Sequence, residues 1–70
     1  MKILAVNVNT TAAMTEQIAD AARAVVREGT EIVGVTPQVG AESVEGNFES
    51  YLCAVAVMDS VATYPDTFDA

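Results

Sequence analysis

The chain alternates short apolar runs with longer stretches of helical periodicity. The run Lys2 to Val6 is almost continuously apolar, which is typical of a strand buried on both faces of a parallel sheet. A second short run, Glu31 to Val35, is rich in β-branched residues and ends at Thr36 and Pro37. The residues from Ala12 to Val26, between these runs, have a helical period. This order predicts a βαβ unit with parallel strands.

The first predicted helix has one apolar and one charged face. We expect the apolar face to pack against the sheet, and it comprises Met14, Ile18, Ala22 and Val25, with Ala21 and Val26 widening it. The opposite face carries Glu16, Asp20, Arg23 and Arg27. Their spacing of three and four residues suits ion pairs on a solvated surface better than a binding patch. Gly29 marks the expected end of the helix, and Gly34 in the next strand indicates either a close helix approach or a weak strand position.

A second helix is predicted from Gly46 or Asn47 to Thr63, with Asn47 as its N-cap, after a turn-rich loop over Pro37 to Val44. Its main apolar stripe consists of Tyr51, Val55, Met58 and Ala62, and other apolar side chains fill much of the remaining circumference: Leu52, Cys53, Ala54 and Val57. A helix of this kind is expected to be covered on two sides. A contact between subunits or domains would supply the second cover.

The residues after Tyr64 include Pro65, which ends the helix. An α/β alternation predicts a third strand next, but none is recognisable before Ala70, so we expect the first strand to keep one bare edge. The predicted fold is the βαβα opening of a doubly wound, flavodoxin-like parallel-sheet lobe, truncated before its third strand, with no domain boundary within residues 1–70. Alone, such a chain should be marginally stable and associate through the bare edge.

The amino-acid composition limits the kinds of molecule that the chain can bind. Three basic and ten acidic residues among 70 give a net charge of −7, and there is no His. Such a surface disfavours nucleic acid and anionic membranes. The apolar run Leu52 to Met58 is too short to span a bilayer, and the N-terminus does not resemble a signal peptide. One Cys and no Cys/His cluster indicate a reducing, cytoplasmic setting without a metal site.

Polar residues gather where the first strand ends and the first helix begins. Asn7, Asn9, Thr10 and Thr11 stand at this junction. Unpaired N–H groups and the positive end of the helix dipole make it suitable for an anion or a carbonyl oxygen. The alternative is that Thr10 or Thr11 simply caps the helix.

Two motifs carry a resemblance to a known family. The segment Val6 to Thr11, followed by Met14-Thr15-Glu16, resembles the start of the hydantoin racemases, which include allantoin racemases and belong to the aspartate/glutamate racemase superfamily. The segment Ser43-Val44-Glu45-Gly46 is similar to a Ser-Ile/Val-Glu-Gly motif at the second helix of these enzymes. The resemblance extends along the whole chain, which corresponds to the N-terminal third or so of a family member.

The resemblance implies a cofactor-independent racemase with two similar α/β lobes, a homo-oligomeric assembly, and a small-molecule substrate that is a 5-monosubstituted hydantoin or allantoin. In this family a cysteine thiolate removes a proton from the stereocentre, and a second cysteine returns one to the opposite face. Both family cysteines correspond to positions beyond Ala70, so we expect no catalytic residue in this chain and no activity from it alone. Cys53 lies in an apolar helix without a neighbouring base, which favours a structural role.

Residues of the first loop are the candidates for substrate binding. Asn9 matches the second Asn of the family motif, and we expect it to donate a hydrogen bond to a substrate carbonyl or carboxylate. Asn7 and Thr10 come next, while Thr11 is better explained as a helix cap. Ser43 and Glu45 either line the cleft or support their own loop, and the sequence leaves both roles open.

Two other functions remain open on the sequence. One is another branch of the same superfamily: an amino-acid racemase, a maleate isomerase or an arylmalonate decarboxylase. The other is a small acidic, non-enzymatic module that dimerises through its bare strand edge and its apolar second helix.

Overall fold

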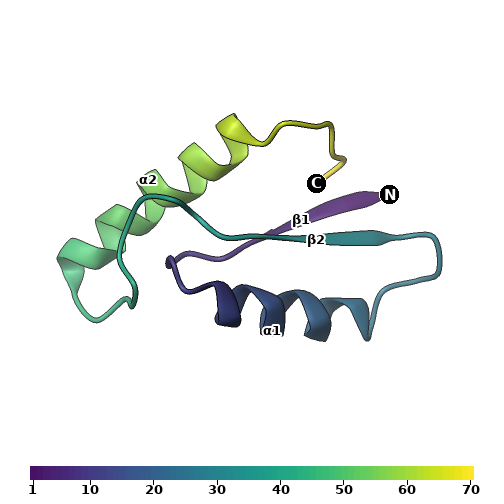
Figure 1. Cartoon of the computed structure of the whole chain (residues 1–70), viewed down its shortest axis with the longest axis horizontal. Helices are drawn as coiled ribbons and strands as arrows, with labels where there is room; N and C mark the ends of the chain where they lie inside the picture. The colour runs from purple at the N-terminus through teal and green to yellow at the C-terminus, as the bar shows by residue number, and fades with distance from the viewer.

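The computed structural model describes residues 1–70 and contains β1 (Lys2–Val6), α1 (Ala12–Arg23), β2 (Glu31–Val35) and α2 (Asn47–Thr63). The two strands pair in parallel, with the first residue of β1 opposite the first residue of β2. The helices lie on opposite sides of this sheet, α1 on one side and α2 on the other (Figure 1). The predicted α/β class, both strand ranges and the parallel βαβ unit are therefore confirmed.

The residues after α2 return along the other edge of β1, so that the two termini lie side by side (Figure 1). The N–H of Leu4 donates to the carbonyl of Ala70 at 2.8 Å, and the N–H of Ala70 donates to the carbonyl of Lys2 at 3.3 Å. This alternation is the hydrogen-bond pattern of a parallel ladder. The expectation of a bare edge on β1 is therefore wrong for its first half, because the chain turns after Pro65 and brings Asp69 and Ala70 alongside it.

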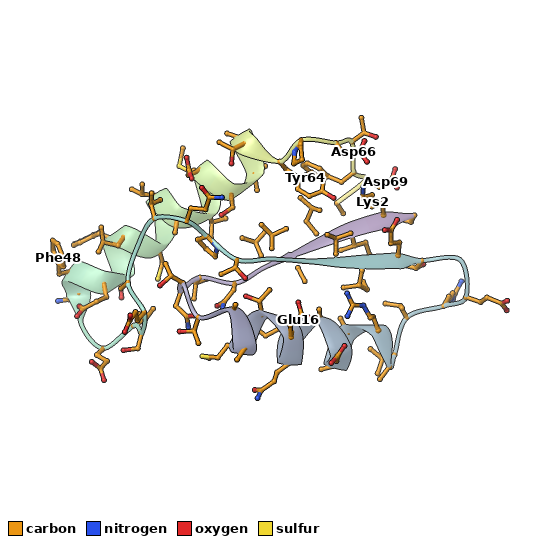
Figure 2. All side chains as sticks on the ribbon, viewed as in Figure 1. Lys2, Glu16, Phe48, Tyr64, Asp66 and Asp69 are labelled. Carbon is orange, nitrogen blue, oxygen red and sulfur yellow. The ribbon has the colours of Figure 1, made fainter.

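Lys2 holds this C-terminal tail through both its backbone and its side chain. Its N–H donates to the carboxylate of Asp69 at 2.7 Å, and its ammonium group lies 2.9 Å from the carboxylate of Asp66. The same ammonium lies 5.2 Å from the centre of the Tyr64 ring, which meets Phe68 edge to face. Figure 2 shows Tyr64, Asp66 and Asp69 close to Lys2. The tail is thus attached to β1 by charge as well as by backbone pairing.

The attachment of the C-terminal tail to β1 should weaken at low pH. The hydrogen bond from Lys2, together with one from the N–H of Thr67, lowers the pKa of Asp66. Because a carboxyl with a depressed pKa stabilises the folded form only while ionised, this contribution is present above the ordinary Asp pKa and is lost as the pH falls through the depressed value. Titration of the Asp66 carboxyl carbon by NMR should give a pKa below 3.8. In Lys2→Met that pKa should rise toward its ordinary value, and an unchanged pKa would contradict the interaction.

α1 differs from its prediction in length and in the face that it buries. It ends at Arg23 rather than near Val26, and Gly29 adopts a φ of +89° in the turn that leads to β2. The buried residues are Thr15 and Ala19, whereas the residues expected to pack on the sheet are largely solvent-exposed: Met14, Ile18 and Val25. The expected face was therefore wrong for Met14, Ile18 and Val25, by a rotation of about one residue, whereas Ala22 and Val26, which were also expected there, are half-buried.

Gly34 explains why α1 turns small side chains toward the sheet. A Cβ atom at this position in β2 would lie 3.0 Å from Cγ2 of Thr15 and 3.2 Å from Cβ of Ala19. Larger side chains at this contact would push α1 away from β2, so the larger residues of the helix lie on either side of the contact. Of the two interpretations of Gly34, the close helix approach is thus confirmed.

The charged face of α1 is exposed, as predicted. Asp20 and Arg23 form an ion pair at 2.9 Å, and the guanidinium of Arg23 also donates to the carbonyl of Ile32 at 3.0 Å. Arg23 thus ties the last turn of the helix to β2.

α2 packs only one of its apolar sides inside this chain. Ala56 and Ser60 are buried, whereas Tyr51, Val55 and Met58 of the main apolar stripe are exposed. A Cβ atom at Gly40 would lie 3.2 Å from Cβ of Ala56, and this close approach again selects a small side chain. The N-cap is Gly46 and not Asn47, which is the first helical residue. Neither helix has the length and apolar character needed to cross a membrane.

Candidate functional site

Asn7 lies at the carboxyl end of β1 and organises the loop that follows. Its side chain is 2% exposed, and its amide nitrogen donates to Oδ1 of Asn9 at 2.9 Å, to the carbonyl of Thr11 at 3.1 Å and to Oγ1 of Thr15 at 3.1 Å. Its own Oδ1 accepts the N–H of Asn9 at 3.1 Å. All the polar atoms of this side chain are therefore used inside the protein.

Asn9 is the residue through which the loop meets α1. Its Oδ1 accepts the N–H of Thr11 at 3.0 Å as well as the bond from Asn7, so this oxygen is fully occupied. Its amide nitrogen has only Sδ of Met14, at 3.5 Å, as a partner. Because a thioether is a weak acceptor and the amide group carries two hydrogens, Asn9 keeps the capacity to donate to another molecule.

Thr11 occupies the N-cap position of α1 without capping the helix through its hydroxyl. That hydroxyl donates instead to the carbonyl of Glu42 at 3.0 Å. Thr11 is therefore the N-cap residue, as expected, but its side chain makes no cap hydrogen bond because its hydroxyl is directed to the carbonyl of Glu42. The N–H groups of Ala12 and Ala13, in the first turn of α1, have no intrahelical partner and remain donors.

Thr10 connects the loop between β1 and α1 to the loop between β2 and α2. Its N–H donates to the carbonyl of Ala41 at 3.0 Å, next to the bond between Thr11 and Glu42. Ser43 and Glu45 follow directly in the second loop, where both are exposed. The structure therefore brings the two sequence motifs, separated by some thirty residues in the chain, to the same end of the sheet.

Two threonines of this site were given no role from the sequence, although Thr15 stands in the first family motif and Thr36 ends the second strand. Thr15 is 1% exposed on the sheet-facing side of α1, and its hydroxyl accepts a hydrogen bond from the hydroxyl of Thr36 at 2.8 Å. It also accepts the bond from Asn7. A hydroxyl residue on the inward face of a helix and another just after a strand were the signals that could have found them.

The resulting polar network, Asn7, Asn9, Thr11, Thr15 and Thr36, ties together the ends of β1 and β2 and the start of α1. No buried side-chain nitrogen or oxygen lacks a partner, so the network holds the loop in one arrangement. The atoms that it leaves available are N–H donors at the positive end of the α1 dipole. This arrangement suits a carbonyl oxygen or an anion.

Other features of the chain lie apart from this network. Cys53 is half-buried on α2. No group of three or more His, Cys, Asp or Glu side chains is close enough to hold a metal ion. A cavity of about 140 Å³ lies between the end of β2 and the last turns of α2, and it shares only Thr36 with the polar network.

The sequence and the fold match one family of known proteins. The family model for Asp/Glu/hydantoin racemases matches residues 3–70. A hydantoin racemase from Pseudomonas sp. (strain NS671) is 41% identical over 61 residues, which cover 87% of this chain and 24% of that protein. A hydantoin racemase from Paenarthrobacter aurescens is 39% identical over 61 residues, covering 87% of this chain and 26% of that protein.

Solved structures agree with this match. The crystal structure of an allantoin racemase from Pseudomonas fluorescens superposes with a TM-score of 0.95 at 70% identity, over 99% of this chain and 29% of that chain. An allantoin racemase from Klebsiella pneumoniae gives a TM-score of 0.84 at 46% identity, over 87% of this chain and 25% of that chain.

The chain spans about a quarter of the length of these relatives. Within that quarter, the match includes both strands, both helices and the loop that carries Asn7 and Asn9. The chain therefore belongs to the Asp/Glu/hydantoin racemase family.

Proposed function

We propose that residues 1–70 are the N-terminal part of the first of two α/β lobes of a racemase that inverts the C5 stereocentre of a 5-monosubstituted hydantoin. The observation that supports this most strongly is the 70% identity to an allantoin racemase over 99% of the chain. Identity to the hydantoin racemases is lower, at 41% and 39%, which favours allantoin as the substrate. No domain boundary falls within the chain on this proposal.

The chemistry required is proton transfer at a carbon acid. The C5 hydrogen of a hydantoin is acidic because its removal gives an enolate whose negative charge rests largely on the adjacent carbonyl oxygen. A base on one face of the ring removes this proton, and an acid on the other face returns one. In the proposed mechanism a cysteine thiolate and a cysteine thiol outside residues 1–70 play these parts. The net reaction neither oxidises nor reduces the substrate and needs no cofactor.

The proposed role of this chain is to bind the ring and stabilise the enolate oxygen. Fixed N–H donors aimed at a developing oxyanion are among the strongest contributions that a protein makes to such a step. Asn9 would donate through its amide nitrogen, with the hydroxyl of Thr10 and the first-turn N–H groups of α1 beside it. Asn7 and Thr11 would hold these donors in place, and Ser43 and Glu45 would lie on the adjoining loop.

The activity can be tested on the full-length protein with one enantiomer of allantoin, and with a 5-substituted hydantoin such as 5-benzylhydantoin for comparison. We expect enzyme-dependent loss of optical rotation and exchange of the C5 hydrogen in deuterium oxide, both insensitive to a metal chelator. Faster turnover of allantoin than of 5-benzylhydantoin would support allantoin as the substrate. Rates no higher than those of an enzyme-free blank for both compounds would contradict the proposed function.

The substitution Asn9→Asp tests the proposed donor. An Asp carboxylate keeps the oxygen that accepts from Asn7 and Thr11, but it replaces the donating nitrogen with a negatively charged oxygen facing the substrate. We expect kcat/KM to fall by about 10² to 10³, which is the effect of removing one oxyanion donor. The midpoint of thermal unfolding serves as the control and should change little. A kcat/KM equal to that of the unmodified enzyme would rule out the donor role.

A further inference from the structure

Two hydroxyl groups link the loop between β1 and α1 to the end of β2. Thr36, directly after β2, donates from its hydroxyl to Oγ1 of Thr15 on α1 at 2.8 Å. The same oxygen accepts a hydrogen bond from the amide nitrogen of Asn7 at 3.1 Å. We propose that Thr36 is a positioning residue for racemisation, and that it acts through Thr15 on the amide nitrogen of Asn9. This inference rests on the proposed function, in which that nitrogen binds the substrate.

The direction of the Asn9 side chain is set by Asn7. The oxygen of a side-chain amide only accepts hydrogen bonds, and its nitrogen only donates them. Oδ1 of Asn9 lies between two donors, the side-chain nitrogen of Asn7 at 2.9 Å and the N–H of Thr11 at 3.0 Å. If the amide of Asn9 were turned over, its nitrogen would face these two donors and both bonds would be lost. The nitrogen of Asn9 therefore points away from Asn7, and its direction follows the position of the Asn7 side chain.

The Asn7 side chain is held from outside its own loop by Thr15. Its other partners belong to the segment from Asn7 to Thr11, so the bonds among them preserve the shape of the loop but can move with it. The backbone N–H of Asn7 donates to the carbonyl of Val35 at 3.0 Å, which fixes the main chain but leaves the side chain free to rotate. The bond from Thr36 to Thr15 therefore ties the Asn7 side chain to the end of β2.

Thr15 has little freedom to absorb a movement. Its side chain is 1% exposed, and a Cβ atom at Gly34 would lie 3.0 Å from its Cγ2, so the methyl group is held against β2. A β-branched side chain in a helix also has few rotamers. A displacement at Thr36 is therefore passed on to Asn7 and from there to Asn9. Such a displacement matters, because misplacing a group by about 1 Å can cost about 10²-fold in rate.

The substitution Thr36→Val tests the proposal, since Val keeps the branched shape and removes the hydroxyl. In the full-length protein we expect kcat/KM for allantoin to fall by about 10-fold to 10²-fold, with kcat falling in step. The loss should stay below that of Asn9→Asp, which removes the donor itself. Thr36→Ser keeps the hydroxyl and should restore most of the activity. The control is Thr63→Val, which removes a similar bond, to the carbonyl of Asp59 at the end of α2, and should leave kcat/KM unchanged.

A double variant shows whether Thr36 acts through Asn9. Once Asn9→Asp has removed the donating nitrogen, Thr36→Val should lower kcat/KM little further, whereas two independent effects would multiply. A general loss of structure would not depend on the Asn9 nitrogen in this way. An unchanged kcat/KM in Thr36→Val would overturn the proposal, as would equal losses from this substitution with and without the Asn9 nitrogen.

NMR separates this inference from the proposed function. In protein labelled with ¹⁵N at asparagine, the side-chain amide signal of Asn9 is identified by its loss in Asn9→Asp. We expect this signal to shift in Thr36→Val and to return in Thr36→Ser, with or without racemase activity. An inactive unmodified protein would contradict the proposed function, while a shifted signal would still support the link from Thr36 to Asn9. A signal that does not move would overturn the inference even in an active enzyme.

Discussion

Replacing Asn7 by Asp should destabilise the folded protein by about 3 to 5 kcal/mol near neutral pH, which is the range for a buried charge without a partner. The new carboxylate oxygen would take the place of the amide nitrogen and face two oxygens that cannot donate, Oδ1 of Asn9 and the carbonyl of Thr11, while only the hydroxyl of Thr15 could turn to donate to it. It would therefore exchange two attractive contacts for repulsive ones in a site that is 2% exposed. Urea unfolding of the full-length protein measures this loss.

The sign of the pH dependence makes this prediction specific. Repulsion and burial would raise the pKa of the new carboxyl above its unfolded value, so the destabilisation should vanish at pH values below the ordinary Asp pKa and grow as the pH rises. Asn9→Asp is the matched control, because Asn9 is also buried, at 5% exposed, but its nitrogen faces only Sδ of Met14, so its replacement should cost less. Equal losses in the two variants would show that the network around Asn7 does not hold the loop.

Replacing Gly34 by Ala should cost about 1 to 3 kcal/mol, the usual range for adding a methyl group to a packed contact, and Gly34→Val should cost more. The added Cβ atom would lie 3.0 Å from Cγ2 of Thr15 and 3.2 Å from Cβ of Ala19. α1 would have to move away from β2, and the hydroxyl of Thr15 would move with it. We therefore expect kcat/KM for racemisation to fall together with stability.

A double variant separates this contact from other effects of the substitution. Thr15→Ser removes Cγ2 but keeps the hydroxyl, so Gly34→Ala should cost less in a Thr15→Ser background, by about 1 kcal/mol in a double-mutant cycle. The second contact, with Ala19, should prevent full recovery. Gly46→Ala is the comparison, since its added Cβ would meet only the end of the flexible Glu49 side chain. Strictly additive losses for Gly34 and Thr15 would contradict the close approach.

The position of the site could be predicted from the sequence, but the hydrogen-bond partners of its side chains could not. Two Asn and two Thr between an apolar strand and an amphipathic helix indicated a polar junction, and the junction is there. Their side chains turn toward one another rather than outward, so that Asn7 is wholly internal and Asn9 keeps one nitrogen available. The partners that cause this, Thr15 and Thr36, come from two other elements, and no spacing within the loop reveals them.

The sequence also did not show which face of each helix is buried. On α1, hydrophobic periodicity selected larger apolar side chains as the sheet-facing ones, yet the close contact with Gly34 of β2 is made by Thr15 and Ala19. On α2, the small side chain of Ala56 lies against Gly40 of the preceding loop. Periodicity measures which positions are apolar and not how closely two elements approach. On α2, where nearly every side is apolar, it could not decide between the two faces.

The sequence by itself determined the order and type of the elements, the parallel pairing of the strands, the acidic surface and the family motifs, because these depend on local preferences and on the alternation of strand and helix. The tertiary structure alone decided which helix faces are buried, how the C-terminal tail covers β1, and which polar atoms at the loop remain available. Each of these depends on groups that are distant in the chain and meet only when β1, α1 and β2 have packed together.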